Sequence, residues 1–303
     1  MMTIATQPLL PDFGAEILHV DLSADISDST FAEILEIYYD RSVVLFRNQS
    51  LSPEAQAKLA HRFGRPKIEN RKQYNLPEHP EVSTIGNAID KYGRPKSFFV
   101  KGGFGWHTDG SAACHVDAAT FLYAVKVPAK GGDTLLCSTA NVVDRLPAEL
   151  LRQLEPLSML CSFHAHNDPL HESDPEAFIP LSEDERKALP AVWHKIVQTH
   201  PVTGRKVLYM SFDPLDCRPG DLADAKQLMI EARDIATVDD QVYRHCWRPG
   251  DLLIWDNHAA LHSGTPTHMY EEDCRLMHRS FVYTVPTERE IPNLDEINRI
   301  FMP

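Results

Sequence analysis

Two short segments of the 303-residue chain carry side chains that can bind a divalent metal. Residues 106–110 read Trp-His-Thr-Asp-Gly, so His107 and Asp109 are two residues apart. On an extended chain such side chains point to the same face and can bind one ion, although a His-x-Asp pair also occurs in ordinary surface turns. The segment 255–264 offers His258 and His262 as a third ligand. Two imidazoles and one carboxylate are typical of non-haem Fe(II) oxygenases, because three coordination positions stay open.

A second group of residues can bind an anion. Arg275 and Arg279 are four residues apart, and on a strand they would share one face. A guanidinium presents a planar fork that matches a carboxylate, and two inward arginines are costly unless each meets an anion. Internal salt bridges with some of the chain's acids are the alternative. The turn Gly131-Gly132-Asp133-Thr134 adds a hydroxyl, that of Thr134, which can donate to a carboxylate oxygen.

The elements that must position these residues are mostly short strands. The periodicity predicts helices at 27–40 and from Ser52 to Gly64, and strands at 13–21 and 42–47. Further strands are expected at 118–127, 133–138, 157–163, 206–211, 241–247, 251–256 and 275–284, and helices at 141–155, 182–188 and 222–235. This order predicts a mainly β fold, a sandwich or barrel with inserted helices.

One compact domain over residues 1–303 is expected, because the sequence contains no repeat, low-complexity tract or flexible linker. Residues 66–105 are rich in glycine, proline and charge and lack sustained periodicity. A segment of this length is commonly functional, so it is predicted to be an active-site lid or substrate loop.

Composition excludes several classes of function. With 30 basic and 43 acidic residues the formal net charge is −13, which disfavours binding to nucleic acid or to an anionic membrane. No run of 18 apolar residues and no signal-peptide pattern is present. The six cysteines are widely spaced and form no CxxC pair, as expected for a reducing cytoplasm.

The order of the motifs resembles the TauD/TfdA (taurine/2,4-D dioxygenase) family of Fe(II)/2-oxoglutarate enzymes. The resemblance covers most of the chain from about residue 42 to about residue 284. It rests on SVVLFRNQSLS, WHTD, GGDTL, HPVTGRKVLYMS, YRHCWRPGDLLIWDN, HSG and RLMHR, in that order.

The resemblance implies a double-stranded β-helix (jelly-roll, cupin-like) core with iron bound by His107, Asp109 and His262, which selects His262 over His258. It also implies that Arg275 and Thr134 bind the distal carboxylate of 2-oxoglutarate. Arg279 matches the position that binds the acidic group of the substrate, a carboxylate or sulfonate. With O2 as the oxidant, the expected reaction hydroxylates an unactivated C–H bond and releases succinate and CO2. Relatives are commonly dimers or tetramers, so a homo-oligomer is expected.

The substrate region departs from the family pattern. Taurine enzymes have a histidine six residues after the Phe of the Phe-Gly pair, where this chain has Glu69, followed by Asn70. A carboxylate would repel a sulfonate, so taurine is disfavoured. Glu69 either faces an amine or hydroxyl of the substrate or is a solvated loop acid. Three aromatic residues are candidate walls for an apolar part of the substrate, namely Tyr74, Phe104 and Trp106.

Two other readings stay open. The first is a facial-triad enzyme with another outcome, such as desaturation or decarboxylation of an amino-acid-like substrate, or one that does not use 2-oxoglutarate. The second is a non-catalytic binding or sensor protein. The complete ligand set argues against the second reading, and Asp109 argues against a halogenase, which needs that ligand position empty.

Overall fold

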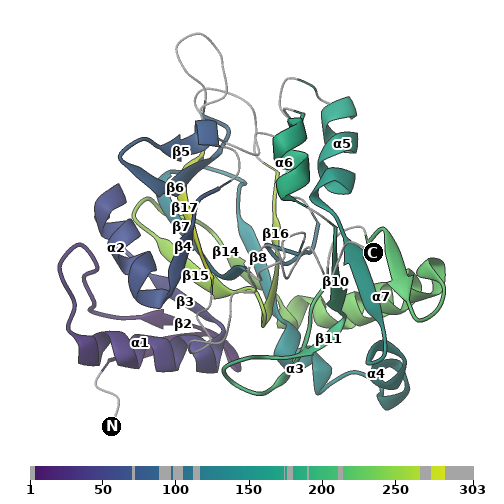
Figure 1. Cartoon of the computed structure of the whole chain (residues 1–303). Helices are drawn as coiled ribbons and strands as arrows, with labels where there is room; N and C mark the ends of the chain where they lie inside the picture. Colours follow the sequence, from purple (N-terminus) through teal and green to yellow (C-terminus); the bar gives the residue numbers. More distant parts are fainter. Residues whose placement is uncertain are drawn as a thin grey trace.

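A large mixed sheet lies at the centre of the computed structural model (Figure 1). The structure describes residues 4–69, 72–88, 97, 105–111, 117–173, 175, 180–189, 191–210, 214–266 and 274–283. Within these residues the sheet has the strand order β1-β2-β3-β15-β7-β17-β6-β5, and β4 also pairs with β17. The strands are β1 (Thr6–Leu10), β2 (Phe13–Ile17), β3 (Val43–Phe46), β4 (Arg65–Lys67), β5 (Asn75–Leu76), β6 (His79–Gly86), β7 (Asp117–Lys126), β15 (Leu252–Asp256) and β17 (Leu276–Tyr283).

A three-stranded sheet, β14-β8-β16, packs against the large sheet and completes the double-stranded β-helix expected from the sequence. Its strands are β14 (Tyr243–His245), β8 (Thr134–Ser138) and β16 (Ala260–Gly264). Two smaller sheets lie outside this core. They consist of β10 (Val192–Lys195), β9 (Ser158–Cys161) and β13 (Asp216–Arg218), and of β11 (Val197–Thr199) and β12 (Lys206–Leu208). The prediction of a mainly β fold with inserted helices is therefore confirmed.

The central strand β15 shows how alternation divides the core into two layers. Leu253 and Trp255 pack between the two sheets, whereas Leu252 and Ile254 pack on the opposite face under the N-terminal helices. Every residue of β15 is buried, since the large sheet is covered on both faces here. Neighbouring strands follow the same period of two, so each side chain's position in sequence decides whether it faces the interior of the sandwich.

Helices α1 (Asp28–Arg41) and α2 (Pro53–Phe63) cover the outer face of the large sheet (Figure 1). Their N-caps are Ser27 and Ser52, each of which accepts a hydrogen bond from the first turn, so both predicted helices are confirmed. The remaining helices are α3 (Thr139–Val143), α4 (Ala148–Leu154), α5 (Phe163–Ser173), α6 (Glu183–Ala188) and α7 (Leu222–Ala236), with 3-10 helices at η1 (Lys72–Tyr74) and η2 (Asp239–Gln241).

Two expectations from the sequence were wrong. The helix predicted at 141–155 is two helices, α3 and α4, because Pro147 has no N–H to donate and disfavours a helical residue before it. The segment 66–105, expected to lack regular structure, contributes the end of β4 and all of η1, β5 and β6, and β6 pairs with β17 in the large sheet. Most of the rest of this segment lies outside the described residues, so its role as a lid stays a prediction.

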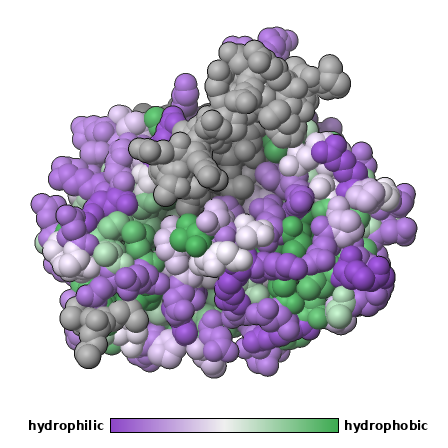
Figure 2. All heavy atoms as spheres, turned by 60° about the horizontal axis from the view of Figure 1, so that its bottom comes forward, coloured by the Kyte–Doolittle hydropathy of each residue, from purple (hydrophilic) through white to green (hydrophobic). Residues whose placement is uncertain are grey.

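The face of the molecule drawn in Figure 2 is largely hydrophilic where the structure describes it. On this face hydrophobic side chains form separate small areas among polar ones. None of the helices that the structure describes is both long enough and apolar enough to cross a membrane. Five of the six cysteines lie in the described part and none of them forms a disulfide, whereas Cys114 lies outside it.

Candidate active site

The backbone brings His107 and His262 side by side. The N–H of His107 donates to the carbonyl of His262 over 3.0 Å, and the N–H of His262 donates back over 2.8 Å. His262 lies in the middle of β16, whereas His107 forms an isolated bridge and Asp109 lies in the turn that follows. The extended chain expected at 107–109 is therefore limited to this bridge, and β16 supplies its partner.

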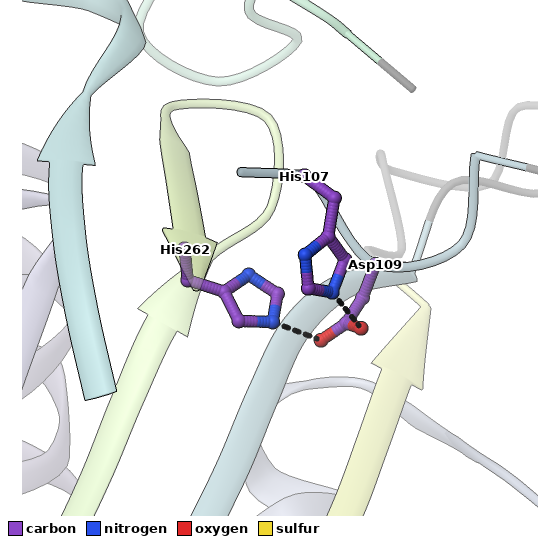
Figure 3. Close-up of side chains that lie close together, drawn as sticks. All are labelled: His107, Asp109 and His262. Carbon is purple, nitrogen blue, oxygen red and sulfur yellow. Dashed lines mark ion pairs between the residues drawn. The ribbon is translucent and has the colours of Figure 1, made fainter. Parts of the chain in front are cut away.

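Side chains of His107, Asp109 and His262 converge on one point (Figure 3). Asp109 Oδ1 is 3.8 Å from His107 Nε2, and Asp109 Oδ2 is 3.6 Å from His262 Nε2. These separations are too long for hydrogen bonds. They suit three donors around one ion, because ligand atoms about 2.1 Å from a metal lie roughly 3–4 Å from one another. The exposed fraction of each of the three side chains is between 11% and 14%, so further ligands can reach the point where they meet.

The orientation of His107 and the pKa of His262 both suit metal binding. His107 Nδ1 lies 2.9 Å from the carbonyl oxygen of Gly105, which can only accept, so Nδ1 carries a proton and Nε2 is the ring nitrogen that faces Asp109. Burial, together with the positive charge of Arg279, lowers the pKa of His262 to about 3. The His262 ring is therefore neutral at physiological pH. Its Nδ1 is buried and has no hydrogen-bond partner within the described part of the chain.

Asp109 is oriented by a chain of hydrogen bonds from neighbouring strands. The Thr120 hydroxyl on β7 donates to Asp109 Oδ2 over 2.8 Å, and the Asn257 side-chain amide donates to the Thr120 oxygen over 2.8 Å. Trp255 Nε1 in turn donates to the Asn257 side-chain oxygen over 3.0 Å. All three supporting residues are buried, so the carboxylate has a fixed orientation.

His200, Asp256 and His258 form a second, fully buried cluster of similar composition, in which both ring nitrogens of His200 are already hydrogen-bonded. His200 Nδ1 accepts from the backbone N–H groups of Val202 and Thr203, so its proton is on Nε2 and is donated to Asp256 over 2.8 Å. Burial would raise the pKa of Asp256, but the hydrogen bond from His200 and the nearby His258 ring outweigh it and hold the pKa at about 2. The structure thus groups His262, and not His258, with His107 and Asp109.

Arg275 lies next to the start of β8. Its Nε donates to the carbonyl of Gly132 over 3.2 Å, and within the described residues it contacts no carboxylate. Burial lowers the pKa of Arg275 to about 10, an effect that Asp133 opposes and Arg279 reinforces. The group still carries its charge at neutral pH, and none of the carboxylates that the structure describes forms an ion pair with it.

Thr134 and Arg275 share a neighbour, Trp247. The indole Nε1 of Trp247 donates to the Thr134 hydroxyl oxygen over 3.0 Å, which directs the hydroxyl proton away from the indole. The Arg275 guanidinium lies 6.0 Å from the centre of the same ring system. The Thr134 hydroxyl proton can therefore be donated to the oxygen atom of a ligand.

Arg279 lies on β17 and points between the two sheets, on the same face as Met277. Its guanidinium donates to Glu69, with Nε 2.9 Å from Oε1. The other predicted substrate residues are less informative. Tyr74 is buried in η1, Trp106 packs at the edge of a hydrophobic cluster, and Asn70 and Phe104 lie outside the described residues.

Comparison with known proteins identifies the family. The model of the taurine catabolism dioxygenase TauD/TfdA family matches residues 5–281. The chain belongs to the TauD/TfdA family. The membership expected from the sequence is thus confirmed, and with it an oxidoreductase of the dioxygenase class.

Named relatives of this TauD/TfdA chain act on aryloxy carboxylates. An alpha-ketoglutarate-dependent 2,4-dichlorophenoxyacetate dioxygenase from Cupriavidus pinatubonensis is 32% identical over 271 residues, covering 87% of this chain and 92% of the relative. A (S)-phenoxypropionate/alpha-ketoglutarate dioxygenase from Sphingobium herbicidovorans is 28% identical, with coverages of 90% and 92%. The crystal structure of a taurine dioxygenase from Burkholderia xenovorans superposes with a TM-score of 0.75 at 26% identity, covering 94% of this chain and 90% of that one.

Sequence reasoning missed several residues of the TauD/TfdA site. Thr120 and Asn257 support Asp109, and Trp247 supports Thr134. Asn257 and Trp247 lie within the quoted family motifs, and a hydrogen-bonding side chain beside a metal ligand is the signal that could have identified them. Thr120 gave no such signal, because it is a single threonine in an otherwise apolar strand.

Proposed function

We propose that this protein is an Fe(II)- and 2-oxoglutarate-dependent dioxygenase that hydroxylates a C–H bond of a small substrate carrying an anionic group. In this proposal His107, Asp109 and His262 bind the metal. The single observation that carries it is the convergence of two imidazoles, that of His262 neutral, and one oriented carboxylate beside the partly buried cation Arg275. Bound iron and 2-oxoglutarate would supply the oxidising chemistry: O2 would take two electrons from 2-oxoglutarate, which loses CO2 to become succinate, and two from the substrate C–H bond, with one oxygen atom entering each product.

The remaining contribution of the chain is to bind and orient. Arg275 binds the distal carboxylate of 2-oxoglutarate, because it is partly buried, charged and without a carboxylate partner among the described residues. Thr134 donates its hydroxyl proton to the same carboxylate, since Trp247 already occupies the hydroxyl's acceptor side. Arg279, deeper in the sandwich, faces the anionic group of the substrate. The relatives named above, which act on phenoxyacetate and phenoxypropionate, support an anionic substrate.

Anaerobic titration tests the proposal. Fe(II) and then 2-oxoglutarate are added to metal-free protein, and the visible absorption spectrum and the heat of binding are recorded. We expect 2-oxoglutarate to bind with a weak visible band and the His262→Ala variant to lose both. The His258→Gln variant is the matched control, because this histidine lies in the neighbouring cluster, and it should keep both signals.

Two results would contradict the proposal. Iron binding that survives in His262→Ala would exclude the assigned ligand set. Iron binding without any 2-oxoglutarate signal in the wild-type protein would leave a metal site but remove the co-substrate, and a facial-triad enzyme of another kind would then take precedence.

A further inference from the structure

The two arginines of the pocket differ in their partners. Arg275 has no carboxylate within the described residues, whereas Arg279 donates through Nε and Nη2 to Glu69 Oε1. Both lie in one electrostatic environment, because the charge of Arg279 contributes to lowering the pKa of Arg275 and that of His262. The pocket therefore offers one cation without a counter-ion and one ion pair.

Glu69 is held in place by the sheet and is not a solvated loop acid. Ser83 on β6 lies directly opposite Arg279 on β17, and its hydroxyl donates to Glu69 Oε1 over 3.0 Å. The side-chain amide of Asn75, opposite Ser83 on β5, donates to the Glu69 backbone carbonyl over 3.1 Å. Side-chain exposure is 17% for Glu69 and 7% for Arg279, so the pair is largely shielded from water. Such a pair interacts more strongly than an exposed one.

The three donors to the Glu69 carboxylate share one oxygen. Arg279 contributes two and Ser83 one, all to Oε1, and no hydrogen bond to Oε2 occurs within the described part of the chain. A carboxylate oxygen accepts about two hydrogen bonds. Oε2 is therefore the position at which Glu69 can receive a further donor, and a cationic donor fits best because the acceptor is charged.

The charges of the pair select among substrates. A substrate with only an anionic group would reach Arg279 beside a fixed negative charge and would be repelled by it. A substrate with only a cationic group would be attracted to Glu69 but repelled by the positive charge of Arg279. A substrate carrying both charges presents its carboxylate to the guanidinium and its ammonium group to Glu69, and neither charge is left unpaired.

We propose that the prime substrate is an amino carboxylate, bound through its carboxylate at Arg279 and through its ammonium group at Glu69 Oε2. This inference rests on the proposed function and narrows the substrate class of the same site. It assigns Glu69 the role of a specificity-determining residue that excludes the deaminated acid of the same carbon skeleton.

Paired compounds test this proposal. The probes are the standard amino acids together with 3-aminopropionate and 4-aminobutyrate, each matched with its deamino acid, such as phenylalanine with 3-phenylpropionate. Binding to the Fe(II)- and 2-oxoglutarate-loaded enzyme is measured anaerobically by calorimetry, and substrate-stimulated succinate release is measured in air. We expect at least one amino acid to bind about tenfold or more tightly than its deamino acid, a difference of about 1.4 kcal/mol.

The Glu69→Gln variant keeps the shape of the side chain and removes its charge. We expect it to weaken the amino acid about tenfold or more and to strengthen the deamino acid, so that the preference reverses. Glu78→Gln, which removes an exposed carboxylate from the turn before β6, is the matched control and should leave the wild-type preference unchanged.

Four outcomes would overturn the inference, three of them from the paired compounds and one from simple amines. The first three are equal or tighter binding of the deamino acids by the wild-type enzyme, a preference that survives in Glu69→Gln, and no response to any amino acid. Simple amines that bind as well as amino acids would also exclude it. All of these results presuppose that iron and 2-oxoglutarate bind in the absence of substrate. If that binding is absent, the proposed function fails instead, and the two failures are thereby distinguished.

Discussion

Replacing Arg275 with methionine separates the energetic cost of burying this cation from its benefit in binding. The guanidinium is partly buried, desolvation lowers its pKa to about 10, and within the described residues its side chain makes one hydrogen bond, to the Gly132 carbonyl. Methionine has a similar length and no charge to desolvate. Asp133 keeps its own partner, because Arg244 donates to it over 2.7 Å. We expect the free energy of unfolding of the protein without 2-oxoglutarate to be unchanged or to rise by about 1 kcal/mol.

The effect on 2-oxoglutarate binding should be opposite and larger. Truncating one partner of a buried charged hydrogen bond costs about 2–5 kcal/mol, which corresponds to a dissociation constant raised about 30-fold to several thousand-fold. At 100 times its dissociation constant, 2-oxoglutarate stabilises the wild-type protein by about 2.7 kcal/mol. For a chain of this size that is roughly a 5 °C rise in Tm. If the substitution raises the dissociation constant about 100-fold, the same concentration of 2-oxoglutarate raises the Tm of the variant by less than about 1 °C.

Thermal unfolding of anaerobic Fe(II)-loaded protein, with and without 2-oxoglutarate, measures both effects in one experiment. Arg205→Met is the control, because it removes a half-exposed arginine that pairs with Asp144. It should show the full wild-type rise in Tm. A full rise in Arg275→Met would refute the assignment of Arg275. A loss of several kcal/mol in this variant without 2-oxoglutarate would show that Arg275 has a structural anionic partner.

Three further predictions concern the residues around the pocket. Thr120→Val removes the hydroxyl that orients Asp109 and should weaken Fe(II) binding about 10- to 100-fold in a competition titration, with secondary structure unchanged. The pKa of His262 is lowered from 6.5 to about 3 in the metal-free folded protein. Between these pH values His262 is therefore protonated in the unfolded chain but not in the folded protein. The stability of the metal-free protein should thus fall as the pH drops from about 6.5 towards 3, by up to about 1.4 kcal/mol per pH unit, and urea unfolding of His262→Gln should show a shallower fall. Gly86→Ala should cost about 3 kcal/mol or more, because the new Cβ would lie 2.0 Å from the Arg275 carbonyl oxygen, whereas Gly204→Ala has the same type of φ strain without that contact and should cost about 1 kcal/mol.

The sequence predicted well those helices that a capping residue and an apolar stripe mark locally. The helices that begin after Ser27 and Ser52 were predicted closely, since a capping residue and an apolar stripe mark them. Helix α5 was missed, because FHAHNDPLHES has little apolar periodicity and contains Pro169. Strand β6 was missed for a related reason. It reads HPEVSTIG and depends on its pairing with β17, which the local sequence does not show.

The candidate site likewise contains residues that the local sequence shows and contacts that it does not. The spacing of His107 and Asp109 was visible in the sequence, but choosing between His258 and His262 required the resemblance to a family. The structure explains that choice through a long-range backbone bridge, which no local pattern encodes. The contact between Glu69 and Arg279 also depends on strand pairing across the large sheet. The sequence therefore identified the types of residue in the pocket better than it identified their partners.

The bridge between His107 and His262 also bears on how the protein folds. The two residues are about 150 positions apart in sequence, and their mutual hydrogen bonds form only when β16 has joined the smaller sheet. Contacts of such long range are formed late, because a large loop must close first. Of the three residues at the proposed metal site, an unfolded or half-folded chain keeps only His107 and Asp109 close together in sequence. Tight metal uptake is therefore a sign of completed folding, and in a refolding experiment it should follow the recovery of the sheets.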